Sequence, residues 1–267
     1  MFADLHLHSS CSDGRLAPAE LVDAVADAGV GIMALTDHDT LAGLEAAAER
    51  AAQRDVIFIP GIEMTAYAHD QVVHMIGLGF DPADAGLQRA NAIAIGVWAR
   101  NQQGWVAALE ADGHDVAYAQ DFSDGPVRLP VLIERLCGKG VADGDPARCL
   151  TLFRDFFSAL PLEAYAALPP PRDAAHIIAS AGGTSILAHP YSVKPDVRMR
   201  EILEQCDGLE ALYAPYDPAH RERLERLCDE ADKLYSCGSD YHGYFSREYE
   251  NPRFSLPELL ALRLTKR

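Results

Sequence analysis

The sequence lacks long apolar runs. No stretch approaches the roughly 18 consecutive apolar residues that a transmembrane helix needs, so we expect no membrane association. The first residues, MFADLHLHSS, also lack a basic segment followed by an apolar one, which argues against a secretory signal peptide. We therefore expect a cytoplasmic protein.

Basic residues and cysteines are scarce as well. Lys and Arg number 23 against 40 Asp and Glu, which gives a formal net charge of −17. Binding of duplex nucleic acid through a basic surface is thereby disfavoured, although bound metal ions can still supply local positive charge for a phosphorylated ligand. The 6 cysteines are widely spaced, and we expect reduced thiols rather than a disulfide framework.

Short apolar strands alternate with amphipathic helices over most of the 267 residues, which predicts a parallel α/β fold. The predicted strands are 2–8, 31–36, 56–64, 72–80, 184–189, 208–213 and 234–239. The predicted helices are 18–28, 41–54, 171–181, 197–206, 218–231 and 256–264. Seven strands over this length favour a β/α barrel over an open sheet.

Residues 84–170 interrupt the alternation. This segment contains helix candidates at 87–110, 130–138 and 150–160 but no strand candidate, and the proline run 169–171 marks a return to the main domain. We therefore predict a β/α barrel formed by residues 1–83 and 171–267, with a helical insertion at 84–170.

Histidines and carboxylates recur at or just beyond the predicted strand ends. In a parallel barrel these ends open onto one face, which holds the active site. Imidazole and carboxylate ligands together suit zinc, manganese or iron. The nine candidate ligands are His6, His8, Asp13, His38, Glu63, His74, His189, Asp240 and His242.

Other residues of these types receive a structural interpretation. His69 falls in a predicted turn, His114 follows a helix end, and His176 and His220 lie in predicted helices. Cys11, within the loop between His8 and Asp13, is expected to be a small buried side chain rather than a thiolate ligand.

The motifs LHLHSSCSDG, LTDHDT, GIEMT, LAHP and GSDYHG together resemble the polymerase and histidinol phosphatase (PHP) family, over residues 4 to 243. The resemblance implies an amidohydrolase-like, distorted seven-stranded β/α barrel with three neighbouring metal positions. The implied ligand sets are His6, His8, Glu63 and Asp240; Glu63, His74 and His189; and Asp13, His38 and His242. Many family members have His at the position of Asp13.

The insertion is similar to that of a family branch that acts on nucleotide phosphates and 5′-phosphorylated RNA. Arg100 and the segment AGGTSILAHP fit that branch, whereas GPVRLPVLIERL departs from its G-R-P-H-like segment, because Val131 stands where His is usual. Arg100, Asn101, Arg128 and Arg135 are the candidate substrate-binding residues, with surface salt bridging as the alternative for the arginines. Trp98, Trp105 and Tyr118 are candidates for stacking a base, although core packing is favoured for both tryptophans.

These features predict a phosphoester hydrolase with two or three divalent ions, manganese being the first choice and zinc or iron(II) the alternatives. Bound metals would neutralise phosphate oxygens and activate water, with Asp13, His38, Glu63 and His242 in catalytic roles. The expected substrate is a nucleoside 3′,5′-bisphosphate that loses its 3′-phosphate. Short 5′-phosphorylated RNA and histidinol phosphate are the alternative substrates; a polymerase accessory module or a non-enzymatic metal-binding module is disfavoured.

Overall fold

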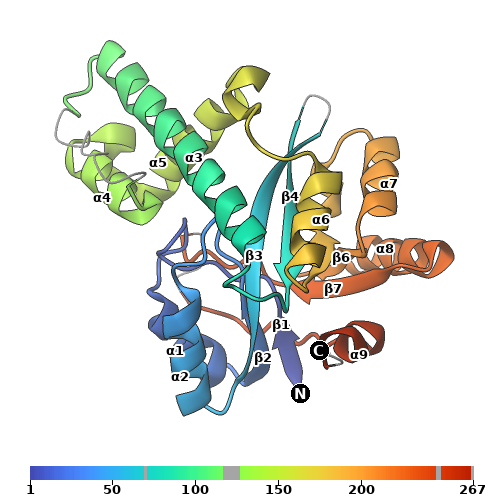
Figure 1. Ribbon diagram of the computed structural model, residues 1–267. Coiled ribbons are helices and arrows are strands. Elements are labelled where there is room, and N and C mark those ends of the chain that lie inside the picture. The colour runs from blue at the N-terminus through green and yellow to red at the C-terminus, as the bar shows by residue number, and fades with distance from the viewer. Residues whose placement is uncertain (69–70, 117–126, 245–247, 266–267) are drawn as a thin grey trace.

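The computed structural model describes residues 1–68, 71–116, 127–244 and 248–265 (Figure 1). Its centre is a seven-stranded sheet in which the strands follow one another in chain order. The strands are β1 (Phe2–Asp4), β2 (Val30–Leu35), β3 (Ile57–Ala68), β4 (Gln71–Leu78), β5 (Thr184–Leu187), β6 (Gly208–Tyr213) and β7 (Leu234–Gly238). All seven predicted strands are present, and the α/β class is confirmed.

The expectation of an all-parallel sheet is wrong at β4. This strand runs antiparallel to both β3 and β5, whereas the remaining neighbours are parallel. Only residues 69 and 70 separate β3 from β4. A parallel pair needs a crossover of a dozen or more residues, so the chain can only turn back and form a hairpin here.

The first and last strands approach each other at one end of the sheet. Leu5 N donates to Cys237 O at 3.0 Å, and Asp240 N donates to His6 O at 2.9 Å. A parallel bridge between Leu7 and Tyr241 continues this contact. The sheet therefore curves until its edges meet at this end, and closure into a barrel along the full strand length stays a prediction.

Helices cover the sheet and bury their apolar faces against it. They are α1 (Pro18–Asp27), α2 (Leu44–Gln53), α6 (Pro171–Ser180), α7 (Asp196–Gln205), α8 (Pro218–Ala231) and α9 (Glu258–Thr265), with a 3-10 turn, η4 (Pro190–Ser192), after β5. In Figure 1, α1 and α2 lie on one side of the sheet and α6 to α8 on the other. Helix α8 begins where predicted, because Pro218 occupies its first turn and the Asp217 side chain accepts a hydrogen bond from His220 N.

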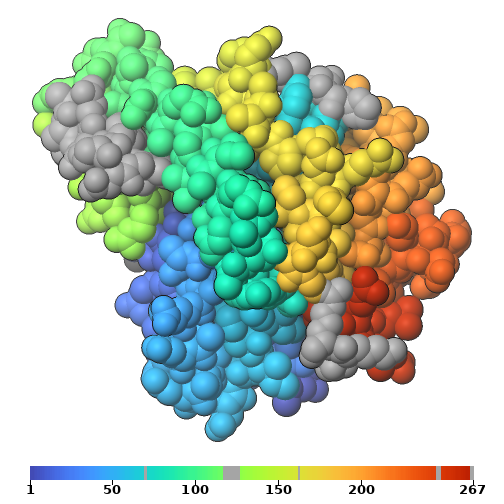
Figure 2. All heavy atoms as spheres, viewed as in Figure 1, coloured from blue at the N-terminus to red at the C-terminus, as the bar shows by residue number. Residues whose placement is uncertain are grey.

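The described residues between 84 and 170 contain helices and no strand. These are α3 (Ala85–Ala111), α4 (Leu129–Gly138), η2 (Val141–Gly144), α5 (Pro146–Ser158) and η3 (Leu162–Tyr165). Helix α5 begins four residues before the predicted start, because Asp145 caps it and Pro146 fits its first position. Trp105, Leu132, Leu136 and Phe153 belong to a cluster of buried side chains separate from the main core. The space-filling view shows the later part of α3 with α4 and α5 as a lobe, while the start of α3 lies against the main body, where Leu87 joins the main core (Figure 2).

Within the described residues, the structure contains no helix that is both long enough and apolar enough to span a bilayer.

Candidate metal centre and substrate cavity

Glu63 lies at the centre of the candidate site. It is fully buried on β3. Its two carboxylate oxygens lie 3.1 to 3.3 Å from five imidazole nitrogens, those of His6, His8, His38, His74 and His189. A carboxylate that contacts five imidazoles on both of its oxygens is suited to bridge cations.

The structure brings all nine candidate residues together from separate segments of the chain. Three groups have potential ligand atoms within 4.8 Å of one another: His6, His8, Glu63 and Asp240; His38, Glu63 and His74; and His8, Asp13, His38 and His242. His189 joins the second group through its 3.1 Å contact with Glu63. His8 and His38 each belong to two groups, so the residues form one continuous cluster rather than three separate sites.

The prediction that every candidate lies at a strand end is wrong for Glu63 and His74. Strand β3 continues to Ala68, five residues beyond Glu63, and His74 is the fourth residue of β4. The hairpin register pairs Thr65 with His74. Because β4 is reversed, its first half lies beside the second half of β3, and this places both side chains in the cluster.

The hydrogen-bond chemistry of His6 fits a bound cation. Its Nδ1 lies 3.0 Å from Glu210 Oε1, an acceptor, so the ring proton sits on Nδ1. Its Nε2 then presents a lone pair toward Glu63 Oε2 at 3.1 Å and Asp240 Oδ1 at 3.4 Å. Nε2 and Glu63 Oε2 are buried and have no hydrogen-bond partner. Three acceptors that face one another need a positive ion between them, and the residues therefore fit a bound metal.

The electrostatics of the neighbouring residues agree with this interpretation. Burial alone would lower the pKa of His8, but its contacts with Asp240 and Glu63 outweigh burial and raise the pKa to about 10. Burial would raise the pKa of Asp240, yet the charges of His6 and His242 hold it well below its usual value. The site thus attracts positive charge strongly, whether as protons or as metal ions.

His242 is arranged in the same way. Its Nδ1 lies 2.8 Å from the Asp240 carbonyl oxygen, which can only accept, so Nδ1 carries the proton. Its Nε2 lies 3.1 Å from Asp13 Oδ2. An imidazole lone pair facing a carboxylate again fits a cation, and Asp13 occupies this position without disrupting the group.

Two further residues hold the cluster, and the sequence analysis missed both. Glu210 on β6 is fully buried; besides its contact with His6, its Oε2 accepts a hydrogen bond from His189 N at 2.9 Å. Tyr213 donates to Asp240 Oδ2 at 2.7 Å. Burial raises the pKa of Tyr213, so the hydroxyl remains a donor. In the sequence, the feature that could have identified Glu210 is that it is the one acidic residue in the apolar segment GLEALY.

The four predicted substrate-binding residues lie on α3 and at the start of or within α4. Arg100 is exposed on α3, Asn101 is buried beside it, Arg128 is exposed immediately before α4, and Arg135 is partly buried in α4. In the described part of the chain, no hydrogen bond or ion pair joins these side chains to the nine candidate ligands. The residue after Arg128 contacts the loop that carries Asp13, since Leu129 N donates to Ser12 O at 3.3 Å.

The two tryptophan candidates pack against phenylalanine rings of α5. Trp105 is 2% exposed and packs edge-on against Phe153, which confirms the core-packing alternative. Trp98 is half-buried and stacks on Phe157, with ring centroids 5.3 Å apart. Tyr118, the third candidate, and His69, the predicted turn residue, lie outside the described residues.

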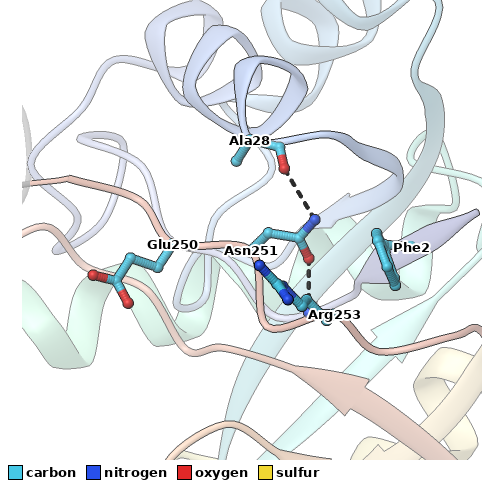
Figure 3. Close-up of a pocket in the computed structure, with 5 residues that line it drawn as sticks. All are labelled: Phe2, Ala28, Glu250, Asn251 and Arg253. Carbon is cyan, nitrogen blue, oxygen red and sulfur yellow. Dashed lines mark hydrogen bonds between the residues drawn. The ribbon is translucent and has the colours of Figure 1, made fainter.

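A cavity of about 500 Å³ adjoins the cluster. Its lining includes Asp240, His242, Tyr213 and Pro215, together with Arg154 of α5 in the insertion and the acidic residues Glu248 and Glu250. A second cavity of about 590 Å³ lies near the start of β1 and is lined by Phe2, Ala28, Glu250, Asn251 and Arg253 (Figure 3). None of the nine candidate ligands lines the second cavity, so the cavity beside Asp240 is the one placed for chemistry.

Comparison with known proteins identifies the family. A model of the PHP domain matches residues 4–121. A 3′,5′-nucleoside bisphosphate phosphatase from Chromobacterium violaceum is 32% identical over 255 residues, covering 90% of this chain and 86% of that protein. The chain belongs to the PHP family. This PHP protein is also 29% identical to a 5′-3′ exoribonuclease from Haemophilus influenzae, over 90% of this chain and 89% of that protein.

A solved structure supports the same assignment. A metal-dependent phosphoesterase from Bifidobacterium adolescentis superposes with a TM-score of 0.79 at 25% identity and covers 98% of this chain and 95% of its own. The PHP protein is therefore a metal-dependent phosphoesterase, a phosphoric ester hydrolase, with several clusters of His, Asp and Glu able to hold metal ions.

Proposed function

We propose that this PHP protein removes the 3′-phosphate of nucleoside 3′,5′-bisphosphates and releases the 5′-monophosphate. The observation that carries the proposal is the cavity shared by Asp240, His242 and Arg154. Its volume falls in the range of small-molecule sites. A guanidinium from the insertion would bind a second phosphate while the first lies at the cluster. The phosphatase relative from C. violaceum supports this choice of substrate.

The proposal assigns the nine cluster residues to metal positions. His6, His8, Glu63 and Asp240 would hold one ion, Glu63 with His74 and His189 a second, and Asp13, His38 and His242 a third. Divalent ions, with manganese the first choice, supply charge neutralisation at the phosphate and activation of water. The insertion, residues 84–170, would select the substrate, with Arg100, Asn101, Arg128 and Arg135 as further candidates beside Arg154.

Hydrolysis breaks the bond between phosphorus and the ribose 3′ oxygen, and water supplies the new oxygen on phosphorus. The departing 3′ oxygen then takes up a proton. His242 lines the cavity, and its Nδ1–H is held by the Asp240 carbonyl. If the third position lacks an ion, Nε2 of His242 in its protonated form can deliver that proton. The Asp13 carboxylate would stabilise this protonated imidazole from 3.1 Å.

The test compares kcat/KM for adenosine 3′,5′-bisphosphate, adenosine 5′-monophosphate, histidinol phosphate and a short 5′-phosphorylated RNA, all with manganese. The bisphosphate should exceed both monophosphates by at least about tenfold, since a lost charged hydrogen bond costs roughly 1.5–3 kcal/mol. Equal turnover of a monophosphate would contradict the second-phosphate argument. An RNA preference above tenfold would favour the exoribonuclease activity of the H. influenzae relative.

Two arginines of α5 offer a matched pair of variants. Arg154→Met removes the guanidinium at the cavity and should raise KM for the bisphosphate about tenfold or more, with little change for a monophosphate. Arg148→Met removes an exposed guanidinium on the same helix, where its partner is Asp143, and should change neither constant.

A further inference from the structure

A hydrogen bond joins the insertion to the loop that carries His38. Trp98 Nε1, on α3, donates to Asp39 Oδ2 at 2.6 Å. Asp39 is 3% exposed, and the same carboxylate accepts Thr65 N at 2.8 Å and the Thr65 hydroxyl. A buried carboxylate needs such donors, so the loss of one destabilises its position.

Asp39 is connected to three candidate ligands of the cluster. It follows His38 directly in the chain, and its backbone N donates to Glu63 O at 3.0 Å. Its carboxylate holds Thr65, which pairs with His74 in the β3–β4 hairpin. The φ of Asp39 is 50°, in the left-handed region that few residues adopt without compensating contacts. The position of this one residue therefore affects His38, Glu63 and His74.

Trp98 also contacts another helix of the insertion, α5. Its ring stacks on Phe157 of α5 with an interplanar angle of 27°. The indole N–H can donate but not accept, and it donates to the Asp39 carboxylate. One side chain thus contacts α5 of the insertion and the loop beside the candidate metal ligands.

We propose that Trp98 is a positioning residue, which fixes His38 and His74 for metal binding through its hydrogen bond to Asp39. The inference holds for any phosphorylated substrate, and it rests on the ligand roles proposed for His38 and His74. It makes the placement of α3 a determinant of metal affinity, although the described part of the insertion contributes none of the nine candidate ligands.

The test compares Trp98→Phe with Trp105→Phe. The first keeps an aromatic ring against Phe157 but loses the N–H, whereas the second alters the insertion core two helical turns away. In competition with a chelator, Trp98→Phe should raise the dissociation constant of one Zn²⁺ or Mn²⁺ at least about tenfold. Loss of a residue that supports metal ligands typically has an effect of this size. Trp105→Phe should bind metal as the wild type does. Equal affinity in both variants would overturn the proposal.

Asp39→Asn changes the acceptor of the same hydrogen bond, and it replaces Trp98→Phe as the test variant if Trp98→Phe does not fold. Asp39→Asn leaves one acceptor oxygen for three donors, Trp98 Nε1, Thr65 N and the Thr65 hydroxyl, so it should lose at least as much metal affinity as Trp98→Phe. Adding Trp98→Phe to it should cost little more, because Trp98 acts through Asp39. Wild-type affinity in Asp39→Asn would also overturn the proposal. His74→Asn tests the ligand role of His74 separately from the positioning role of Trp98. If His74→Asn keeps the full metal content, the ligand assignment is wrong, whatever the result for Trp98→Phe.

Fluorescence gives a readout independent of activity. The chain has 2 tryptophans, so Trp105→Phe leaves Trp98 as the sole indole. Addition of Zn²⁺ to the metal-free Trp105→Phe protein should shift its emission, whereas the metal-free Trp98→Phe protein should respond little. The same response from both proteins would contradict a specific link through Trp98.

Discussion

Replacement of Glu210 by Gln tests how the cluster is held without removing a proposed ligand. The ionised carboxylate accepts on both oxygens, from His6 Nδ1 at 3.0 Å and from His189 N at 2.9 Å. The contact with His6 keeps the ring proton on Nδ1 and leaves the Nε2 lone pair directed at Glu63. Gln has nearly the same size but only one acceptor oxygen.

The magnitude follows from the two orientations open to the amide. With its oxygen toward His6, the NH₂ group faces the backbone N–H of His189, and a buried donor loses its acceptor. With its oxygen toward His189, the NH₂ group favours a proton on His6 Nε2, which blocks ligation. An unsatisfied buried group costs about 1–3 kcal/mol. At about 1.4 kcal/mol per tenfold change, this predicts a roughly 5- to 140-fold loss of metal affinity.

The assay is chelator competition for Mn²⁺ or Zn²⁺, combined with kcat/KM at saturating metal. Asp207→Asn is the control, because it converts a carboxylate just before β6 into an amide. Asp207 accepts hydrogen bonds from Ser185 N and Oγ, both at 2.9 Å, away from the cluster. The control should retain wild-type metal affinity. If Glu210→Gln also retains it, the reasoning about the His6 tautomer is refuted.

Three further predictions concern the cluster and the insertion. Chelation should abolish activity and manganese should restore it; full turnover by a preparation shown to be metal-free by elemental analysis would contradict metal dependence. Glu63→Gln should lower turnover at least about 10²-fold more than the surface change Glu222→Gln, because Glu63 contacts five imidazoles; similar losses would show that the site is misplaced. The double variant Arg100→Ala and Arg135→Ala should keep its metals and bind phosphorylated nucleosides more weakly; unchanged kinetic constants would remove both arginines from the substrate site.

The elements that were predicted well carry strong local signals. Helix α8 has an aspartate and a proline at its start, and the nine candidate ligands stand out because His, Asp and Glu are rare beside apolar strands. The direction of β4 was missed because the barrel pattern was extended over the seven residues between the predicted strands 56–64 and 72–80, which are too few for the crossover that a parallel pair needs. The sequence pattern of a strand does not reveal its direction.

Residues that act through distant partners could not be located from the sequence. Glu210 is one acidic residue in an apolar strand, and its role appears only when His6, 204 residues earlier, lies beside it. Arg154 resembles any other charge on an amphipathic helix until the cavity is visible. For Trp98 the sequence favoured core packing over stacking of a base, and the hydrogen bond to Asp39 spans 59 residues.

The meeting of the first and last strands has a consequence for how the protein acquires metal. His6 and Asp240 are brought together by a backbone hydrogen bond between the two ends of the sheet. A chain emerging from the ribosome cannot complete the group of His6, His8, Glu63 and Asp240 until its final strand has been synthesised and has docked. Loading of this group therefore follows synthesis of the chain through Asp240. An ion bound by this group would stabilise the folded structure, because separation of β1 from β7 would break up its ligand set.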